Sequence, residues 1–207
     1  MLTTIGTDIE KRLEIQKDKS EIISFMVSVV NRPDYKKKKK KSIRFPYNYE
    51  ASFKSKRGNR YNCIFTITDK KSIINPLISV STTLDTDKGT YVLRYDVVIG
   101  SVAIFTPHFF KRYRERFLKD DIISPEEVRK KYLKRNPIVT ITNKEVGDAV
   151  ASCKDGYIYA RLKDDRTIIY VTFVSLDMLS DEQLKTHSGL LEKIRKYEDL
   201  IEQGFNV

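Results

Sequence analysis

The side chains best suited to chemistry lie in one short segment that follows Pro107. His108, Arg112 and Arg116 are spaced four residues apart, so a helix would place them along one side. A histidine exchanges protons near neutral pH, and the planar fork of an arginine binds two phosphate oxygens while it stays charged. These residues could therefore hold a phosphodiester and move a proton at it. The alternative interpretation is a local hydrogen-bonding histidine beside solvated arginines.

Glu115 lies in the same predicted helical turn and is the one nearby candidate for a general base. The alternative is an ion pair with Arg112 or Lys119, because residues three and four apart meet on a helix surface. An aromatic stripe of Phe109, Tyr113 and Phe117 runs beside the basic one. We expect the aromatic stripe to pack on a sheet and the basic stripe to lie at its rim.

A second polar group alternates along two predicted strands. Tyr157, Tyr159 and Arg161 fall on one strand face, because intervening positions 158, 160 and 162 are apolar. Tyr170 and Thr172 share one face of the next strand. We predict that Tyr157, Tyr159, Arg161 and Tyr170 bind substrate and complete a polar site beside the helix.

Hydrophobic periodicity and breaker residues predict the elements that position these groups. Thr106 and Ser124 are each followed by Pro, which is typical of a helix N-terminus. Helices are predicted over 7–30, 108–118, 125–135 and 181–204. Strands are predicted over 45–53, 61–68, 77–82, 91–98, 102–106, 138–142, 146–153, 157–162 and 167–174.

This order predicts an α+β fold, with a mainly antiparallel sheet and helices packed on one side. The second half has the order β-α-α-β-β-β-β-α. We predict an N-terminal helix and lysine-rich segment over 1–45, then an α+β domain over 46–207. Within that domain we expect a β-rich extension over 46–100, a core over 101–180 and a C-terminal helix over 181–207.

The positive charge is concentrated in one stretch of the chain. The net charge is +11, and residues 31–60 alone contain twelve Lys or Arg against two acidic residues. The centre of this stretch is an unbroken run of Lys36, Lys37, Lys38, Lys39, Lys40 and Lys41. Such a run attracts polyanions without reading sequence, and we predict that it binds nucleic acid. The alternatives are a solvated tether and, less favoured, a membrane-surface patch, which no lipidation signal or amphipathic anchor accompanies.

Several other classes of protein are excluded or disfavoured. Two His and two Cys without close spacing do not form a familiar zinc site, and no phosphate-binding glycine loop is present. We therefore expect no metal and no cofactor. No apolar run approaches the length of a membrane helix, and no secretory signal opens the chain. We expect a cytoplasmic protein in which Cys63 and Cys153 are reduced.

The second half resembles the small RelE/barnase-like domains, which include the RelE-type toxin ribonucleases and a related uncharacterised bacterial family. The resemblance covers about residues 100–180 and rests on His108, Arg112, Glu115 and Arg116 in the first helix, with Thr172 at a strand end. It implies cleavage of RNA without metal, in which a 2′-hydroxyl attacks the adjacent phosphate. By this resemblance the five residues are catalytic, and a neutralising protein partner is expected. About 100 residues precede the matching part, and the toxins are about half this length.

The sequence thus supports a metal-independent RNA-cleaving or RNA-processing protein. The alternative is a non-catalytic nucleic-acid-binding accessory protein of a phage or mobile element. A third hypothesis is an interaction module that dimerises through the acidic, amphipathic final helix. RNA is the favoured nucleic acid in the first hypothesis, whereas the second predicts binding to DNA and RNA alike.

Overall fold

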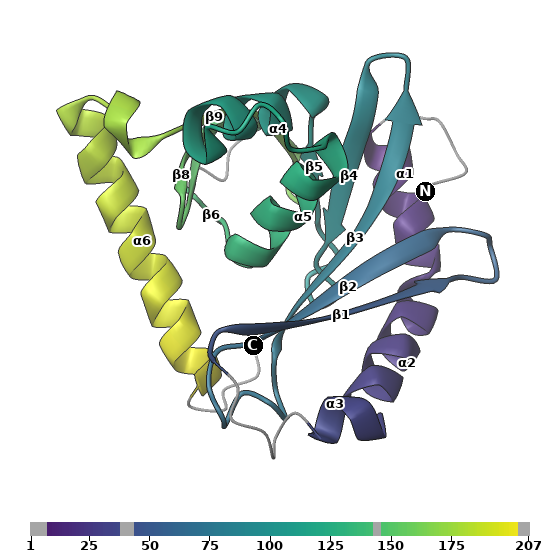
Figure 1. Cartoon of the computed structure of the whole chain (residues 1–207). Coiled ribbons are helices and arrows are strands. Elements are labelled where there is room, and N and C mark those ends of the chain that lie inside the picture. The colour runs from purple at the N-terminus through teal and green to yellow at the C-terminus, as the bar shows by residue number, and fades with distance from the viewer. Residues whose placement is uncertain (1–7, 38–43, 143–145, 203–207) are drawn as a thin grey trace.

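The computed structural model describes residues 8–37, 44–142 and 146–202 (Figure 1). The N-terminal elements are α1 (Asp8–Lys17), α2 (Lys19–Val30), α3 (Pro33–Lys37), β1 (Tyr47–Lys54), β2 (Arg60–Ile67), β3 (Leu77–Thr86) and β4 (Gly89–Tyr95). The remaining elements are β5 (Val102–Phe105), α4 (Pro107–Tyr113), the π-helical segment η2 (Arg114–Leu118), α5 (Pro125–Arg135), β6 (Thr140–Ile141), β7 (Gly147–Cys153), β8 (Gly156–Asp164), β9 (Thr167–Val174), the 3₁₀ turn η3 (Leu176–Met178) and α6 (Asp181–Glu202).

The nine strands of the described residues all belong to one sheet, in the order β1-β2-β3-β4-β5-β9-β8-β7-β6. Strands β1 to β5 form an antiparallel meander, and β6 to β9 form a second one. The two meanders join where β5 pairs with β9 in parallel. Between these two strands the chain leaves the sheet through α4 and α5 and returns at β6. The fold is therefore α+β with a mostly antiparallel sheet, as the sequence predicts.

The sheet has an apolar core on each face. On one face α1 and α2 bury Ile15 and Ile22 against alternate residues of β2, such as Cys63 and Phe65. On the other face α4 and α5 pack with residues of the opposite parity, including Ile64. The prediction of helices on one side only is therefore wrong, because successive strand residues point to opposite faces and both are apolar here. The first core also crosses the boundary that the sequence predicted near residue 45.

The local signals that position α4 and α5 are confirmed. The Thr106 side chain accepts a hydrogen bond from the Phe109 amide, and Ser124 does the same for Glu127. Phe109 and Tyr113 are buried against the sheet, as the predicted aromatic stripe requires. After Tyr113 the helix widens into η2, which ends at Leu118 and is capped by Lys119. This widening changes where the side chains after Tyr113 point.

Candidate nucleic-acid interface

The predicted basic stripe begins on α4 with His108, which is exposed, and Arg112. Both lie within the regular part of the helix, so their four-residue spacing places them on one side. The Arg112 Nη1 atom donates to Glu115 Oε2 at 2.9 Å. This hydrogen bond is the main cause that lowers the pKa of Glu115 below its ordinary value. Glu115 therefore pairs with Arg112, the alternative that the sequence left open, and is a weak proton acceptor.

Arg116 does not continue the stripe. Its Nη1 atom donates to the backbone carbonyl of Phe173 at the end of β9, at 2.6 Å. The cause is the π-helical turn, which adds a residue to each turn and ends the four-residue alignment that a regular helix gives. Arg116 thus ties the end of the helix to the sheet, while Arg112 faces Glu115.

The predicted residues of β8 lie together with Thr172 of β9, but on the other face of the sheet from α4. Ile158 and Ala160 belong to the core under α4, so Tyr157, Tyr159 and Arg161 point away from it. Thr172 is the direct neighbour of Tyr159 across the β8–β9 pair, on that same face. The predicted alternation on β8 is confirmed. The expectation that these residues converge with His108 in one site is wrong, because α4 covers the opposite face.

Tyr157 and Tyr159 form an aromatic pair with ring centres 5.6 Å apart. Tyr157 is buried, whereas Tyr159 is 41% exposed and accepts a hydrogen bond at its hydroxyl from Gln183 of α6. Arg161 is exposed and pairs with Asp148 at 3.2 Å. This face therefore carries aromatic and charged groups that already have partners within the molecule.

Tyr170 differs from the other predicted strand residues, because it lies in the core beneath α4. Its ring centre is 4.8 Å from that of Phe105, and only 3% of the residue is exposed. Burial raises the pKa of Tyr170 to about 12. Tyr170 therefore packs the core and does not face solvent, which corrects its prediction as a substrate-binding residue.

Of the lysine run, the structure places only the beginning. Lys36 and Lys37 end α3, and both are exposed. The Lys36 ammonium donates to the Asn31 side-chain oxygen at 3.1 Å. Lys38, Lys39, Lys40 and Lys41 lie outside the described residues.

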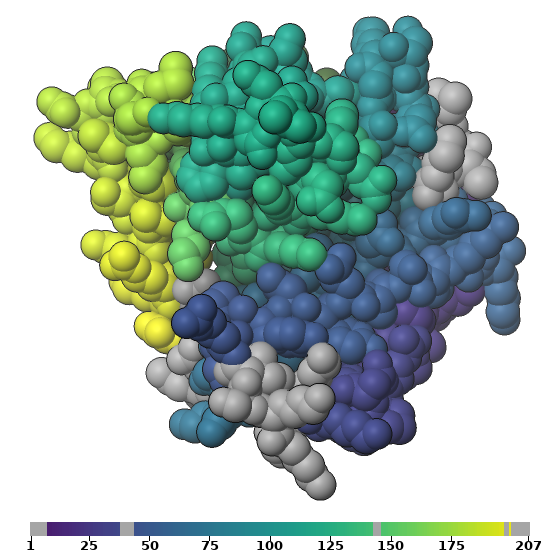
Figure 2. Space-filling model, in the orientation of Figure 1, coloured from purple at the N-terminus to yellow at the C-terminus, as the bar shows by residue number. Residues whose placement is uncertain are grey.

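A larger set of cations lies on the helices that cover the sheet in front in Figure 2. Residues 107–137 contain ten Lys or Arg and five Asp or Glu. Some cations have carboxylate partners, as in the pairs Lys130–Glu126 and Lys134–Glu50. Others have no carboxylate within 4 Å among residues 8–37, 44–142 and 146–202, namely Lys111, Arg114, Arg129 and Lys131. We call these four residues the α4–α5 cations.

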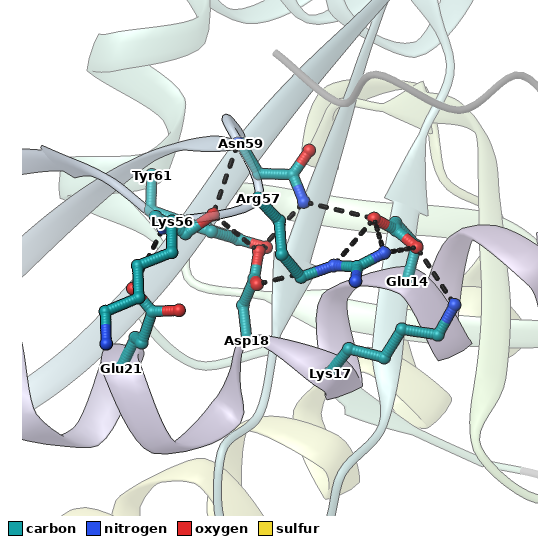
Figure 3. A network of polar contacts seen from close by, with 9 residues as sticks. Glu14, Lys17, Asp18, Glu21, Lys56, Arg57, Asn59 and Tyr61 are labelled. Atoms are coloured by element: carbon teal, nitrogen blue, oxygen red, sulfur yellow. Dashed lines mark hydrogen bonds and ion pairs between the residues drawn. The ribbon is translucent and has the colours of Figure 1, made fainter.

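Sequence reasoning missed two buried clusters of hydrogen-bonded side chains. In the Asp18 cluster, drawn in Figure 3, the carboxylate at the α1–α2 junction accepts from Ser55, Asn59 and Tyr61 at 2.8–2.9 Å. Glu14 lies one turn earlier and binds Arg57, whose hydrogen bonds are the main cause that lowers the pKa of Glu14. The sequence signal for this cluster was the pair of acids, four residues apart, beside Ile15 and Ile22. The cluster fastens the β1–β2 turn to the helices.

The Asp155 cluster does the same for the β7–β8 turn. Asp155 accepts from Tyr113 of α4 at 2.7 Å and from Asn136, after α5, at 2.8 Å. Arg135 donates through two nitrogens, each at 2.9 Å. Burial alone would raise the pKa of Asp155, but the hydrogen bonds from Arg135, Tyr113 and Asn136 outweigh it, and the pKa is lowered. This cluster fixes α4 and α5, and with them the α4–α5 cations.

An open depression of about 340 Å³ lies among the described residues, beside the start of β4 and the end of β5. Its lining includes Lys11, Lys88 and Tyr91, and it contains none of the predicted site residues that the structure describes. No described group of three or more metal-ligating side chains converges. The catalytic prediction therefore depends on His108 and its helix neighbours alone.

No described helix has the length and the apolar character that crossing a membrane requires. Both cysteines are buried and unpaired with each other. The resemblance to RelE/barnase-like domains remains a prediction. No family model, no curated protein and no solved structure matches this chain.

Proposed function

We propose that the protein binds the phosphate backbone of nucleic acid through the α4–α5 cations, without reading base sequence. The observation that supports this proposal is the set of Lys111, Arg114, Arg129 and Lys131, which have no carboxylate partner among the described residues. Cations that form no ion pair with an internal carboxylate are available to phosphates, and each phosphate contact releases counterions. The excess of ten basic over five acidic residues in segment 107–137 favours a polyanion further.

The rigidity of the helix pair adds to this proposal. Phe109 and Tyr132 pack edge to face with ring centres 4.9 Å apart, which joins α4 to α5. The Asp155 cluster joins both helices to the β7–β8 turn. Because the helices are fixed, the backbone that carries the cations needs little ordering when they bind, which favours affinity.

Binding is best measured by fluorescence anisotropy with a single-stranded RNA, a single-stranded DNA and a DNA duplex over a series of salt concentrations. We expect all three to bind, with an affinity that falls steeply as salt rises. In a variant with Lys111→Gln, Arg114→Gln, Arg129→Gln and Lys131→Gln, we expect at least tenfold weaker binding. The logarithmic salt slope should fall by about 0.7 to 0.9 for each phosphate that the variant no longer neutralises.

A matched control removes the same charge elsewhere. The changes Lys54→Gln, Lys70→Gln, Lys71→Gln and Lys88→Gln affect four exposed lysines outside α4 and α5. An equal loss of affinity in both variants would contradict the proposal, since it would assign binding to net charge alone. Replacement of Lys36–Lys41 by Ser measures the separate contribution of the lysine run.

Cleavage of bound RNA is the second candidate, favoured by the exposure of His108 on the same side of α4 as Arg112. A histidine there could move a proton at a phosphate that the neighbouring cations hold. The test is RNA degradation by the purified protein in EDTA. We expect cleavage that His108→Ala abolishes while RNA binding stays unchanged. Intact RNA after incubation of the wild-type protein with several substrates would leave binding as the function.

A further inference from the structure

His187 is a buried titratable residue that the proposed function does not use. It lies in the first half of α6 and is 3% exposed. Neither of its ring nitrogens has a hydrogen-bond partner among the described residues. A buried polar group without a partner lowers the stability of the fold, so such a residue calls for an explanation.

The helix that carries His187 is held by few side chains. Among the α6 side chains that the structure describes, the buried ones are His187, Leu190 and Ile194. They share one side of the helix, which contacts β6 and β7. In Figure 1 the helix runs along one side of the molecule, away from α1 to α5. Elements with few buried contacts open locally at a lower free energy than the core.

The titratable groups around His187 would not stabilise a protonated imidazole in the docked helix. Strand β6 has no titratable side chain, and Asp148 of β7 is 86% exposed and paired with Arg161. Cys153 of β7 belongs to the core on the other face. Strand β8 presents Tyr157 and Tyr159 on this side. The charged residues of α6 near His187 in sequence are all exposed: Asp181, Glu182, Lys185, Glu192 and Lys193.

We propose that α6 is a cover that acid releases from the sheet, with His187 as the titrating residue and Tyr157 as the residue that release exposes. The docked helix holds a neutral imidazole, and burial lowers the pKa of His187 below its ordinary value. The released helix places the imidazole in water, where it binds a proton more readily. The released state therefore binds more protons, and docking weakens as the pH falls below the ordinary histidine pKa of about 6.5.

One contact and one burial identify what α6 covers. Gln183 donates to the Tyr159 hydroxyl at 2.7 Å, and Tyr157, whose ring packs on that of Tyr159, is 4% exposed. Release of the helix breaks the contact and opens the aromatic pair on β8 to solvent. This inference does not rest on nucleic-acid binding, because it concerns the face of the sheet that α4 and α5 do not cover.

The test is hydrogen exchange of the full chain at pH 7.5 and pH 5.0, corrected for the intrinsic pH dependence of exchange. We expect amides of residues 181–196 to exchange several-fold faster at pH 5.0, while residues 60–86 of the core strands stay unchanged. The variant His187→Phe should lose this pH dependence. The matched control is His108→Gln, which removes the other histidine of the chain and should behave as wild type.

A second measurement does not depend on the folding of a variant. In a proton NMR titration of the wild-type chain, the His187 ring signal should titrate below the ordinary histidine pKa of about 6.5, together with the signals of Tyr157. Equal protection of α6 at both pH values would overturn the proposal. A uniform loss of protection across all strands would also overturn it, because it would show global unfolding in place of helix release.

Discussion

The Asp18 and Asp155 clusters have the same structural role on opposite faces of the sheet. Each fastens a hairpin turn to helices through one buried aspartate that accepts from a tyrosine hydroxyl and an asparagine amide. The two clusters differ in which element carries the aspartate and which carries the donors. Asp18 lies at a helix junction and its partners come from the β1–β2 hairpin, whereas Asp155 lies in the β7–β8 turn and its partners come from α4 and α5.

The two clusters differ in how the arginine is used. Arg135 donates to both oxygens of Asp155. Arg57 is instead committed to Glu14, and its nearest nitrogen is 3.8 Å from Asp18 Oδ1, which has no hydrogen-bond partner among the described residues. Hydrogen bonds to both oxygens of a buried carboxylate offset more of its desolvation cost than hydrogen bonds to one oxygen. We infer that the Asp155 cluster stabilises the fold more strongly than the Asp18 cluster.

The sharpest test of this inference compares Asp155→Ala with Asp18→Ala. We expect Asp155→Ala to lower the free energy of unfolding by about 3 kcal/mol, because it leaves the donors of Arg135, Asn136 and Tyr113 without an acceptor. For Asp18→Ala we expect about 2 kcal/mol, since the change also removes an unpaired buried oxygen. Urea unfolding followed by circular dichroism measures both. Asp165→Ala, at an exposed position, is the control, and an equal loss in the two buried variants would refute the ranking.

Low pH should remove part of the stability that Asp155 contributes. The pKa of Asp155 is lowered in the folded protein, so its contribution to stability is fully present above the pKa of an unfolded aspartate, about 3.9. That contribution is lost as the pH falls through the folded pKa. We therefore expect the stability difference between wild type and Asp155→Asn to shrink between pH 6 and pH 2.5 in urea unfolding. A difference that stays constant over this range would show that the charge of Asp155 is not what the cluster uses.

The smallest expected effect comes from the tyrosines. Tyr113→Phe and Tyr61→Phe each remove one hydroxyl that donates to a buried carboxylate and leave the ring in place. We expect each change to lower the free energy of unfolding by about 1–2 kcal/mol. In the double variants with Asp155→Ala and Asp18→Ala, the tyrosine changes should add little. Full additivity in thermal unfolding would mean that the hydroxyls act outside the clusters.

The elements near the predicted site were predictable from sequence because their signals are local. A cap followed by proline at Thr106 and Ser124 fixes where a helix begins, and alternation fixes that Tyr157 and Tyr159 share a strand face. What could not be predicted was which face α4 would cover, because periodicity relates residues within one element only. The capture of Arg116 by the Phe173 carbonyl depends on a widened turn that leaves no mark in residue spacing.

The long N-terminal helix was also predicted in part. Periodicity over 7–30 is continuous, but the structure divides the segment into α1 and α2 at Asp18. The reason is tertiary, since Asp18 is fully buried among side chains of the β1–β2 hairpin. A sequence pattern reports apolar spacing, and it does not report a hairpin that reaches the helix from more than thirty residues away.

The parallel pairing of β5 with β9 has a consequence for synthesis of the chain. When the first meander has left the ribosome, the backbone of β5 faces solvent until β9 is made, because its partner residues begin only at Thr167. An unpaired strand edge recruits other strands, and contacts between distant segments form slowly. Nascent chains that stop before Thr167 should therefore aggregate. Chains long enough to expose β9 outside the ribosome should pair it with β5 and stay in solution.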